Sequence, residues 1–353
     1  MAPDQVGTVV MTVVGFHHSH EQVHPATLLE VARHAQDVGF DAGMCSDHWA
    51  PWSATQGHSG HAWTWLGAAL ATTDLPFGAV NAPGQRYHPA VVAQSVATLG
   101  AMFPGRFWVA LGSGENVNEH ITGGPWPAKA VRDARLRECV DVIRALLDGE
   151  EVTHDGLVQV DRARLWTLPE QRPLLVGPAV TPQTAARHAD WADGLVTVNQ
   201  DPRRLRDVVD AYRSAGGRGS LALQVHVSWA PDADTAFALA REQWTANVVG
   251  PPVAWDLDTP EAFDSLVPHL SDDLVRRSVL VDHDPQRLLD RVAALVGLGF
   301  DAVYLHQVAT DERPRHGKHP SAAPTATPAA AGLRAFLDMA GEHLVGPLRE
   351  VTA

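Results

Sequence analysis

The sequence predicts an α/β protein built as a closed (β/α)8 TIM barrel with insertions. Apolar runs typical of buried strands alternate with helical patterns, and eight such steps follow one another along the chain. Gly39–Ala42 and Gly299–Ala302 repeat the same Gly-Phe-Asp-Ala entry into a strand, which we interpret as the recurring unit of the barrel. A doubly wound open sheet is the alternative. The absence of a G-x-G-x-x-G motif after the first strand weakens it.

The predicted strands are apolar on both faces, as buried parallel strands are. They are Val9–Phe16, Ala42–Ser46, Phe77–Asn81, Phe107–Leu111, Leu174–Val176, Leu195–Val198, Leu221–Ser228 and Ala302–His306. The helical patterns between them are Pro25–Val38, His61–Thr73, Pro89–Met102, Lys129–Leu147, Thr181–Ala189, Pro202–Ala215, Ala233–Trp244 and Pro285–Leu298. Gly39 and Gly299 follow two of these helices and are expected to end them.

We expect residues 1–353 to form a single barrel domain with insertions. The inserted segments are residues 113–128, 150–166, 248–278 and 308–331. The second is predicted to be a β-hairpin, and the third interrupts the step after the seventh strand. The fourth is rich in Pro, Ala and His and leads to a helix near Gly332–Leu348. Since it follows a barrel strand, it is expected on the catalytic face, either as a surface loop or as a lid.

The composition excludes several classes of function. The net charge of -14 disfavours a nucleic-acid partner or an anionic membrane. The two cysteines, Cys45 and Cys139, suit a reducing cytoplasm, where we expect the protein to act. The N-terminus lacks a basic region, and Val9–Phe16 is too short to span a bilayer. Lysine occurs only at positions 129 and 318, which leaves little for Schiff-base chemistry.

Two polar clusters follow apolar runs and carry the candidate chemistry. Cys45–Trp52 ends the second predicted strand, and Gly112–Glu119 ends the fourth. In a barrel both would reach the same mouth. His48 is a candidate general base, because its ordinary pKa lies near neutrality, and Glu115 is a second acid or base from the facing side. Asp47 would orient His48 or bind a ligand hydroxyl. The alternative is a solvated strand-end histidine beside a helix-capping aspartate.

A metal-dependent hydrolase is a remote alternative, because His18-Ser19-His20 ends the first predicted strand. Such a site needs ligands from other strand ends. The fifth and sixth strands end in Gly177-Pro178-Ala179 and Val198–Gln200, which contain no histidine. We therefore expect no metal, and expect these histidines to line a loop. The small residues of Phe77–Pro83 instead suit a flat ligand stacked at the third strand.

Several segments, in this order, resemble the luciferase-like flavin and deazaflavin oxidoreductases. Within them the chain is similar to the coenzyme F420-dependent glucose-6-phosphate dehydrogenase group, and to an adjacent group of FMN-dependent or flavinoid oxidoreductases. The similarity runs from about Val14 to His306. The matching segments are Ser19–Gln22, Ser46–His48, Pro51–Trp52, Gln56–His58, Arg86–Val91, Gly112–Glu119 and Ala192–Gly194.

The resemblance implies a deazaflavin or flavin ring at the C-terminal mouth of the barrel. By this resemblance His48 takes the proton of the substrate hydroxyl, Glu115 protonates the ring, Trp52 packs beside the reacting groups and Glu21 supports the site. The positions that would contact the cofactor are Asp47, Ala79, Val80, Asn81, Gly112, Ser113, Gly114, Asn118, Gly177, Pro178 and Ala179. A non-proline cis peptide would fall near Ala79-Val80. Homodimers are common among the relatives and are expected here.

One departure from the family pattern concerns the substrate. The sugar-phosphate enzymes hold phosphate with two lysines and an arginine, and only the arginine has a counterpart, Arg277. The segments where the relatives have these lysines are Asn199–Asp201 and Ala254–Asp256 here, and neither contains a lysine. The expected substrate contacts are therefore Trp52, Trp255 and Arg277. With Lys129 and Lys318 expected elsewhere, we predict that glucose 6-phosphate is not the substrate.

The resemblance and this departure together imply an F420-dependent oxidoreductase for an uncharged hydroxyl or carbonyl compound. FMN, in a reductase or monooxygenase, is the alternative cofactor. A barrel that binds a ligand without catalysis is a further alternative.

Overall fold

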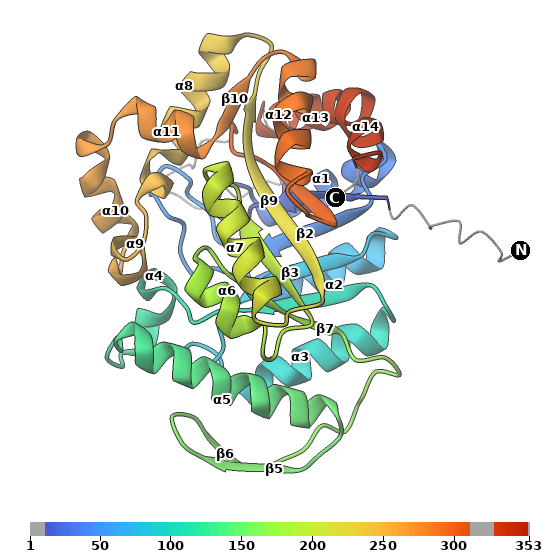
Figure 1. Ribbon diagram of the computed structural model, residues 1–353, viewed down its shortest axis with the longest axis vertical. Helices are drawn as coiled ribbons and strands as arrows, with labels where there is room; N and C mark the ends of the chain where they lie inside the picture. The colour runs from blue at the N-terminus through green and yellow to red at the C-terminus, as the bar shows by residue number, and fades with distance from the viewer. Residues whose placement is uncertain (1–10, 311–327, 352–353) are drawn as a thin grey trace, which may run out of the picture.

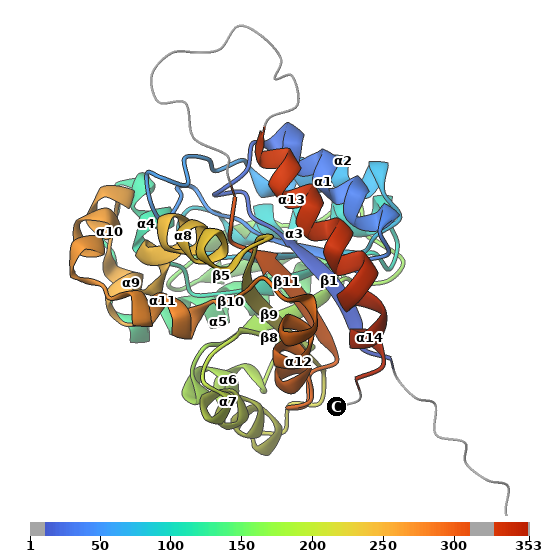
Figure 2. The same cartoon turned by 90° about the horizontal axis from the view of Figure 1, so that it is seen from above.

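The computed structural model describes residues 11–310 and 328–351, and its centre is a closed barrel of eight parallel strands (Figures 1 and 2). The chain of pairings closes because β8 and β9 also pair with each other. The predicted (β/α)8 barrel is thus confirmed. The barrel strands are β1 (Val13–His18), β2 (Ala42–Ser46), β3 (Phe77–Asn81), β4 (Phe107–Leu111), β7 (Leu174–Pro178), β8 (Gly194–Val198), β9 (Ser220–Trp229) and β11 (Ala302–Gln307).

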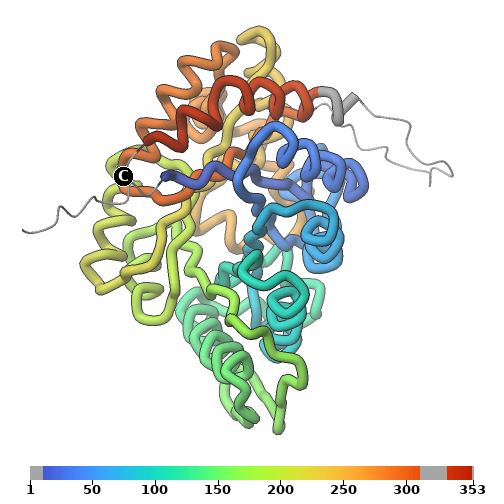
Figure 3. Tube along the Cα trace, turned by 90° about the vertical axis from the view of Figure 1, so that its right-hand side faces the viewer, coloured from blue at the N-terminus to red at the C-terminus, as the bar shows by residue number. Residues whose placement is uncertain are grey.

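Helices surround the barrel, as the 3.6-residue patterns predicted. They are α1 (Pro25–Asp37), α2 (Ala62–Thr72), α3 (Pro89–Met102), α5 (Lys129–Leu147), α6 (Pro182–His188), α7 (Pro202–Ser214), α8 (Ala233–Trp244), α12 (Pro285–Val296) and α13 (Pro328–Ala340). The helix α13 packs against α1, so helices from near the two ends of the chain lie side by side (Figure 3). A π-helical turn (Gly341–Val345) and α14 (Gly346–Arg349) continue from α13. No helix in the described ranges is both long and apolar enough to cross a membrane.

The insertions lie outside the regular repeat. Residues 150–166 contain the antiparallel hairpin of β5 (Val152–Asp155) and β6 (Gln159–Ala163). Residues 248–278 form α9 (Val253–Asp256), α10 (Pro260–Leu266) and α11 (Asp272–Ser278), which gather with α8 at one side of the barrel (Figures 1 and 2). Most of 308–331 falls at residues 311–327, so the choice between loop and lid lies outside the described residues.

Two structural details differ from the sequence prediction. The first strand begins at Val13 and continues to His18, because its pairing with β11 starts at Val13 and its pairing with β2 extends to His18. A short strand, β10 (Leu280–Asp282), was not predicted. It pairs with the end of β9, and three residues are too few to produce a periodic signal.

Alternation along each strand separates two apolar cores, because successive side chains point to opposite faces. Inside the barrel lie Ala42, Met44, Ala110, Val176, Val196 and Tyr304, with Val80 packed against them. The larger core lies between the strands and the helices and contains Ala79. Ala79 therefore faces away from the barrel interior, and its prediction as a cofactor contact is wrong, whereas Val80 faces inward.

Gly78 on β3 leaves the space into which the Trp108 indole packs. A β-carbon at position 78 would lie 1.9 Å from Cζ2 of Trp108. We expect Gly78→Ala to lower the free energy of unfolding by about 1–3 kcal/mol, since the indole must move within a filled barrel. Gly67→Ala is the control, because a β-carbon there meets no atom within 4 Å in the middle of α2. It should raise stability by about 0.5–1 kcal/mol. Urea denaturation of both variants compares the two effects, and equal stabilities would contradict the packing argument.

Candidate active site

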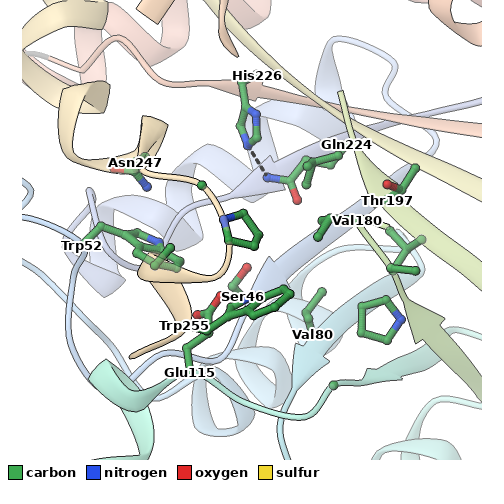
Figure 4. Close-up of a pocket in the computed structure, with 18 of the residues that line it drawn as sticks. Ser46, Trp52, Val80, Glu115, Val180, Thr197, Gln224, His226, Asn247 and Trp255 are labelled. Carbon is green, nitrogen blue, oxygen red and sulfur yellow. Dashed lines mark hydrogen bonds between the residues drawn. The ribbon is translucent and has the colours of Figure 1, made fainter. Parts of the chain in front are cut away.

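A pocket of about 910 Å³ opens at the C-terminal ends of the barrel strands. Its wall is shared by the strand ends and by the inserted segment around Trp255 (Figure 4). The pocket brings together most of the residues predicted from the sequence. These are Glu21, Asp47, His48, Trp52, Val80, Asn81, Gly112, Ser113, Gly114, Glu115, Asn118, Pro178, Ala179, Trp255 and Arg277.

Gly177 is a predicted cofactor contact that the structure places outside this pocket. A β-carbon at this position would lie 2.7 Å from the Cβ of His188 on α6. Gly177 therefore faces the helix layer, and its absence of a side chain serves strand–helix packing. The next two residues of the same turn, Pro178 and Ala179, do line the pocket.

His48 is held between two carboxylates at the bottom of the pocket. Its Nδ1 atom lies 3.0 Å from Oε1 of Glu21. The hydroxyl of Ser19 donates a 2.8 Å hydrogen bond to the other oxygen, Oε2, of Glu21. Both Ser19 and Glu21 are buried, so the carboxylate has a fixed position. An anion beside Nδ1 favours the tautomer with the proton there, which leaves the Nε2 lone pair available to the pocket.

Glu115 lies on the other side of His48. Its Oε2 atom is 3.9 Å from Nε2 of His48. The side chain is 26% exposed, and it lines the pocket, so this exposure is to the pocket interior. Burial raises the pKa of Glu115 above its ordinary value, although the charge of His48 acts in the opposite direction. An imidazole and a carboxyl group with a raised pKa thus face one another.

Trp52 covers this pair and is itself held by the inserted segment. The ring centroids of Trp52 and His48 are 5.2 Å apart in an edge-on arrangement, and those of Trp52 and Phe263 are 5.3 Å apart. The carboxylate of Asp264 accepts hydrogen bonds from Ser53 Oγ (2.6 Å) and from the Ala54 N–H (3.0 Å). The insertion therefore positions the loop that carries Trp52 beside His48.

Asn118 ties the two polar clusters to each other. Its Oδ1 atom accepts a 2.9 Å hydrogen bond from the Trp49 N–H. Its Nδ2 atom lies 3.5 Å from Oε2 of Glu115. Asn118 is buried and also lines the pocket. Its bonds to the Cys45–Trp52 cluster indicate that it fixes the relative position of that cluster and Glu115.

Asp47 belongs to a buried ionic network that the sequence did not reveal. Arg86 lies between two buried carboxylates, with Nη2 at 3.4 Å from Oδ2 of Asp47 and Nε at 3.6 Å from Oε1 of Glu119. The Arg86 N–H also donates a 2.7 Å bond to Oε2 of Glu119. Burial raises the pKa of Glu119, an effect that Arg86 opposes. The network fixes the ends of β2 and β4 around the loop that follows β3.

The pocket offers unfilled polar and steric features that suit a flat ring. Asn81 donates from Nδ2 to Oδ2 of Asp47 at 2.8 Å, while its buried Oδ1 has no partner in the described part of the chain. An N–H at the edge of a deazaflavin or flavin ring can satisfy this oxygen. A β-carbon at Gly112 would come within 3.3 Å of the Pro178 ring, so glycine keeps the space between β4 and β7 open. These residues fit the cofactor that the resemblance implies.

The non-proline cis peptide expected near Ala79-Val80 is absent. The cis peptide bond in the described ranges is Pro251-Pro252, in the inserted segment. The strand β3 is instead regular through this region, pairing residue by residue with β4 from Phe77 to Asn81. The prediction is therefore wrong for this chain. Val80 reaches the pocket through ordinary strand alternation.

Lys129 lies in the pocket, contrary to the expectation that it would lie elsewhere. It begins α5, where it pairs with Asp133, and its Nζ atom lies 3.2 Å from Oγ of Ser113 and 5.4 Å from the centroid of the Trp255 indole. Burial lowers the pKa of Lys129, which Asp133 opposes. Arg204 and Arg277 are further pocket cations, and both are exposed. The positive charge of the pocket is therefore at its rim.

The histidines of the proposed metal site do not converge. His18 points into the helix layer, with its ring 5.3 Å from that of Trp65 and 5.4 Å from that of Phe77. His20 packs edge-on against the same Trp65 ring. Burial lowers the pKa of each to about 3. His18 and His20 therefore lie outside the pocket, and no metal-binding group of three or more suitable side chains occurs in the residues described.

Some pocket residues were missed because they lie within predicted apolar strands. Thr197 on β8 and Gln224 and His226 on β9 line the pocket, together with His17 and His306. The only sequence signal was a polar residue at every second position, as in Gln224 and His226. This pattern marks the inner face of a barrel strand.

The fold and the site agree with the comparisons to known proteins. Residues 5–302 match the family model described as luciferase-like monooxygenase, and the chain belongs to this family. It is 33% identical over 311 residues to a protein of Microbacterium testaceum named F420-dependent glucose-6-phosphate dehydrogenase, which covers 84% of this chain and 92% of that protein. A protein of the same name from Beutenbergia cavernae is 32% identical, covering 86% and 93%.

A solved structure is also similar over nearly the whole chain. It is an F420-dependent secondary alcohol dehydrogenase in complex with an F420–acetone adduct. The two chains are 28% identical and superpose with a TM-score of 0.83, covering 96% of this chain and 100% of the other. The residues that the resemblance selected therefore lie in a barrel of the same architecture.

Proposed function

We propose that this protein is an oxidoreductase that uses coenzyme F420 to interconvert an uncharged, non-phosphorylated alcohol and its carbonyl compound. The observation that carries the proposal is the opposition of His48 Nε2 and Glu115 Oε2, 3.9 Å apart at the bottom of a large pocket. When bound, the deazaflavin ring accepts a hydride from the carbinol carbon. The proposed setting is the cytoplasm, with the chain as a homodimer.

The protein's own residues handle the protons of this reaction. His48 accepts the hydroxyl proton at Nε2 as the carbon–oxygen double bond forms, while Glu21 stabilises the resulting imidazolium at Nδ1. Glu115 holds a proton at its carboxyl group for delivery to the cofactor, and its raised pKa supports this role. Trp52 excludes water from the reacting groups. In the opposite direction the same groups return the protons.

The proposed cofactor site lies along β3, β4 and β7. Val80, Asn81 and Gly112 would bound the ring, with Ser113, Gly114, Asn118, Pro178 and Ala179 around it. Asp47 acts through its hydrogen bond to Asn81. F420 carries an anionic tail, and the rim cations Lys129 and Arg204 are suitably placed to attract it. Trp255 and Arg277 would contact substrate near the opening.

An uncharged substrate is supported by the charge state of the pocket interior. Burial lowers the pKa of His226 to about 4 and that of His17 well below its ordinary value, so both are neutral at physiological pH. A phosphate dianion at these side chains would lose its hydration without gaining a cation. The similarity to a secondary alcohol dehydrogenase also favours a neutral substrate.

Titration of the purified protein with F420 and with FMN, followed by an alcohol, sugar and sugar-phosphate panel, tests the proposal. We expect saturable binding of F420, weaker binding of FMN, and loss of the deazaflavin absorbance with neutral alcohols. Turnover of glucose 6-phosphate at micromolar KM would contradict the neutral substrate. Reduction of FMN without any reaction of F420 would contradict the cofactor.

A further inference from the structure

The part of the pocket formed by β9 contains a polar pair that the proposed chemistry does not use. Gln224 and His226 follow one another on the inner face of the strand, and both line the pocket. Figure 4 shows the Gln224 amide nitrogen bonded toward His226 and its oxygen turned away from that ring. Apolar side chains would suffice to fill this position, so a buried amide and imidazole require a polar explanation.

A chain of hydrogen bonds fixes which atom of this pair is a donor and which an acceptor. It starts at the backbone carbonyl of Val308, which can only accept, so Nε2 of Gln22 donates to it at 2.9 Å. The other amide atom of Gln22, Oε1, is then the acceptor 3.0 Å from Nε2 of His306. His306 therefore carries its proton on Nε2 and has a free lone pair on Nδ1.

The same reasoning continues to the pocket. Nδ1 of His306 accepts from Nε2 of Gln224 at 3.0 Å, and the second proton of that amide points to Nε2 of His226 at 3.3 Å. A neutral His226 then carries its proton on Nδ1. Gln224 has used both amide protons and keeps its Oε1 as an acceptor. The pair thus presents one fixed acceptor, Oε1 of Gln224, and one fixed donor, the Nδ1–H of His226.

We infer that Gln224 and His226 form a subsite for a second, non-reacting hydroxyl group, so that the substrate is an unphosphorylated polyol or sugar. A hydroxyl is both a donor and an acceptor, so a substrate hydroxyl can donate to Oε1 of Gln224 or accept from the Nδ1–H of His226. The imidazole of His17 lies beside this subsite, with its ring centroid 4.4 Å from that of His306, and it also lines the pocket.

The subsite discriminates by hydrogen bonding rather than by charge. A phosphate oxygen would be repelled by Oε1 of Gln224, and an alkyl group would leave both polar atoms without partners. A site with polar groups for a hydroxyl strongly rejects a substrate analogue that lacks the hydroxyl. An apolar site rejects an analogue with an extra hydroxyl less strongly. The inference rests on the proposed function for the identity of the reaction, but binding of the hydroxyl can be measured without it.

The test uses three ring compounds that differ in their hydroxyl groups: cyclohexanol, cyclohexane-1,2-diol and myo-inositol. In the wild-type protein with F420, kcat/KM should rise by roughly tenfold or more from the first compound to the hydroxylated ones. In His226→Phe this preference should fall at least tenfold, and Gln224→Leu should do the same. His269→Phe, on the exposed surface, is the matched control and should keep the wild-type preference.

Calorimetric titration of the cofactor-free protein with the same compounds separates the two proposals. If the protein binds myo-inositol more tightly than cyclohexanol, and His226→Phe loses this difference, the subsite is supported. This holds even if none of the compounds reduces F420, because the lack of reduction would count against the proposed function alone. Equal binding of the three compounds by the wild-type protein, or an unchanged preference in both folded variants, would overturn the subsite.

Discussion

Replacing His48 with alanine is expected to slow hydride transfer by roughly 10²- to 10⁴-fold at neutral pH. The variant lacks the imidazole that lies between two carboxyl groups, at 3.0 Å from Glu21 and 3.9 Å from Glu115. Without it, the hydroxyl proton has no acceptor while hydride leaves carbon. Single-turnover reduction of F420 by a good alcohol substrate measures the effect directly.

The pH dependence separates a base from a merely structural histidine. An acidic limb in the pH–rate profile of alcohol oxidation by the wild-type protein should be missing in His48→Ala. KM should change much less than kcat. His269→Ala serves as the control, since His269 is exposed on the inserted segment. Full hydride transfer by His48→Ala would show that another group accepts the proton.

The second large effect is expected for Glu115→Gln, which should reduce kcat by about 10²-fold or more. Glutamine keeps the shape of the side chain and its distance from His48 but cannot release a proton. Oxidation of alcohol by the wild-type protein should slow as pH rises through the raised pKa of Glu115, because the acid is then already ionised. The variant should lack this alkaline limb. Steady-state rates between mildly acidic and alkaline pH test the expectation.

Glu115→Gln should also stabilise the protein at neutral pH. Burial raises the pKa of Glu115 in the folded state, so the unfolded chain loses this proton first as pH rises. At pH values above the raised pKa, the ionised Glu115 therefore destabilises the folded state relative to the unfolded chain. This destabilisation disappears below about pH 4, where Glu115 is protonated in both states. The Tm of the variant should exceed that of the wild type at pH 7 and match it in acid. Glu342→Gln, at an exposed position, should show no such difference.

The sequence predicted the barrel because its signal is repeated in every step. Strands such as Phe77–Asn81 and Phe107–Leu111 have the observed bounds, since a continuous apolar run ends sharply in polar residues. The same sharp ends located His48 and Glu115, because the carboxyl ends of barrel strands share one face. Ala79 was misassigned by extending a family pattern to a residue that strand alternation turns outward.

Other features depend on contacts that a linear pattern cannot express. Arg86 lies in a loop after β3, yet it joins Asp47 and Glu119. Lys129 begins a helix and does not follow a predicted strand, so the sequence pattern placed it outside the site. Gln224 and His226 lie within an apolar run, where a polar residue every second position is a weak signal. The contacts of these side chains form only in the closed barrel, between segments that are distant in the sequence.

Because Trp52 is held by the inserted segment, substitutions in that segment can change the pocket wall without changing the barrel. His48 and Glu115, the proposed proton-transfer groups, lie in the loops that directly follow barrel strands. The position of Trp52 beside them depends on Phe263 and Asp264, which belong to α10. Substitutions in α10 can therefore reshape the space above the reacting carbon while leaving the proton path untouched. In this chain, specificity can thus be altered through one surface helix and its neighbours, separately from the residues proposed for the reaction.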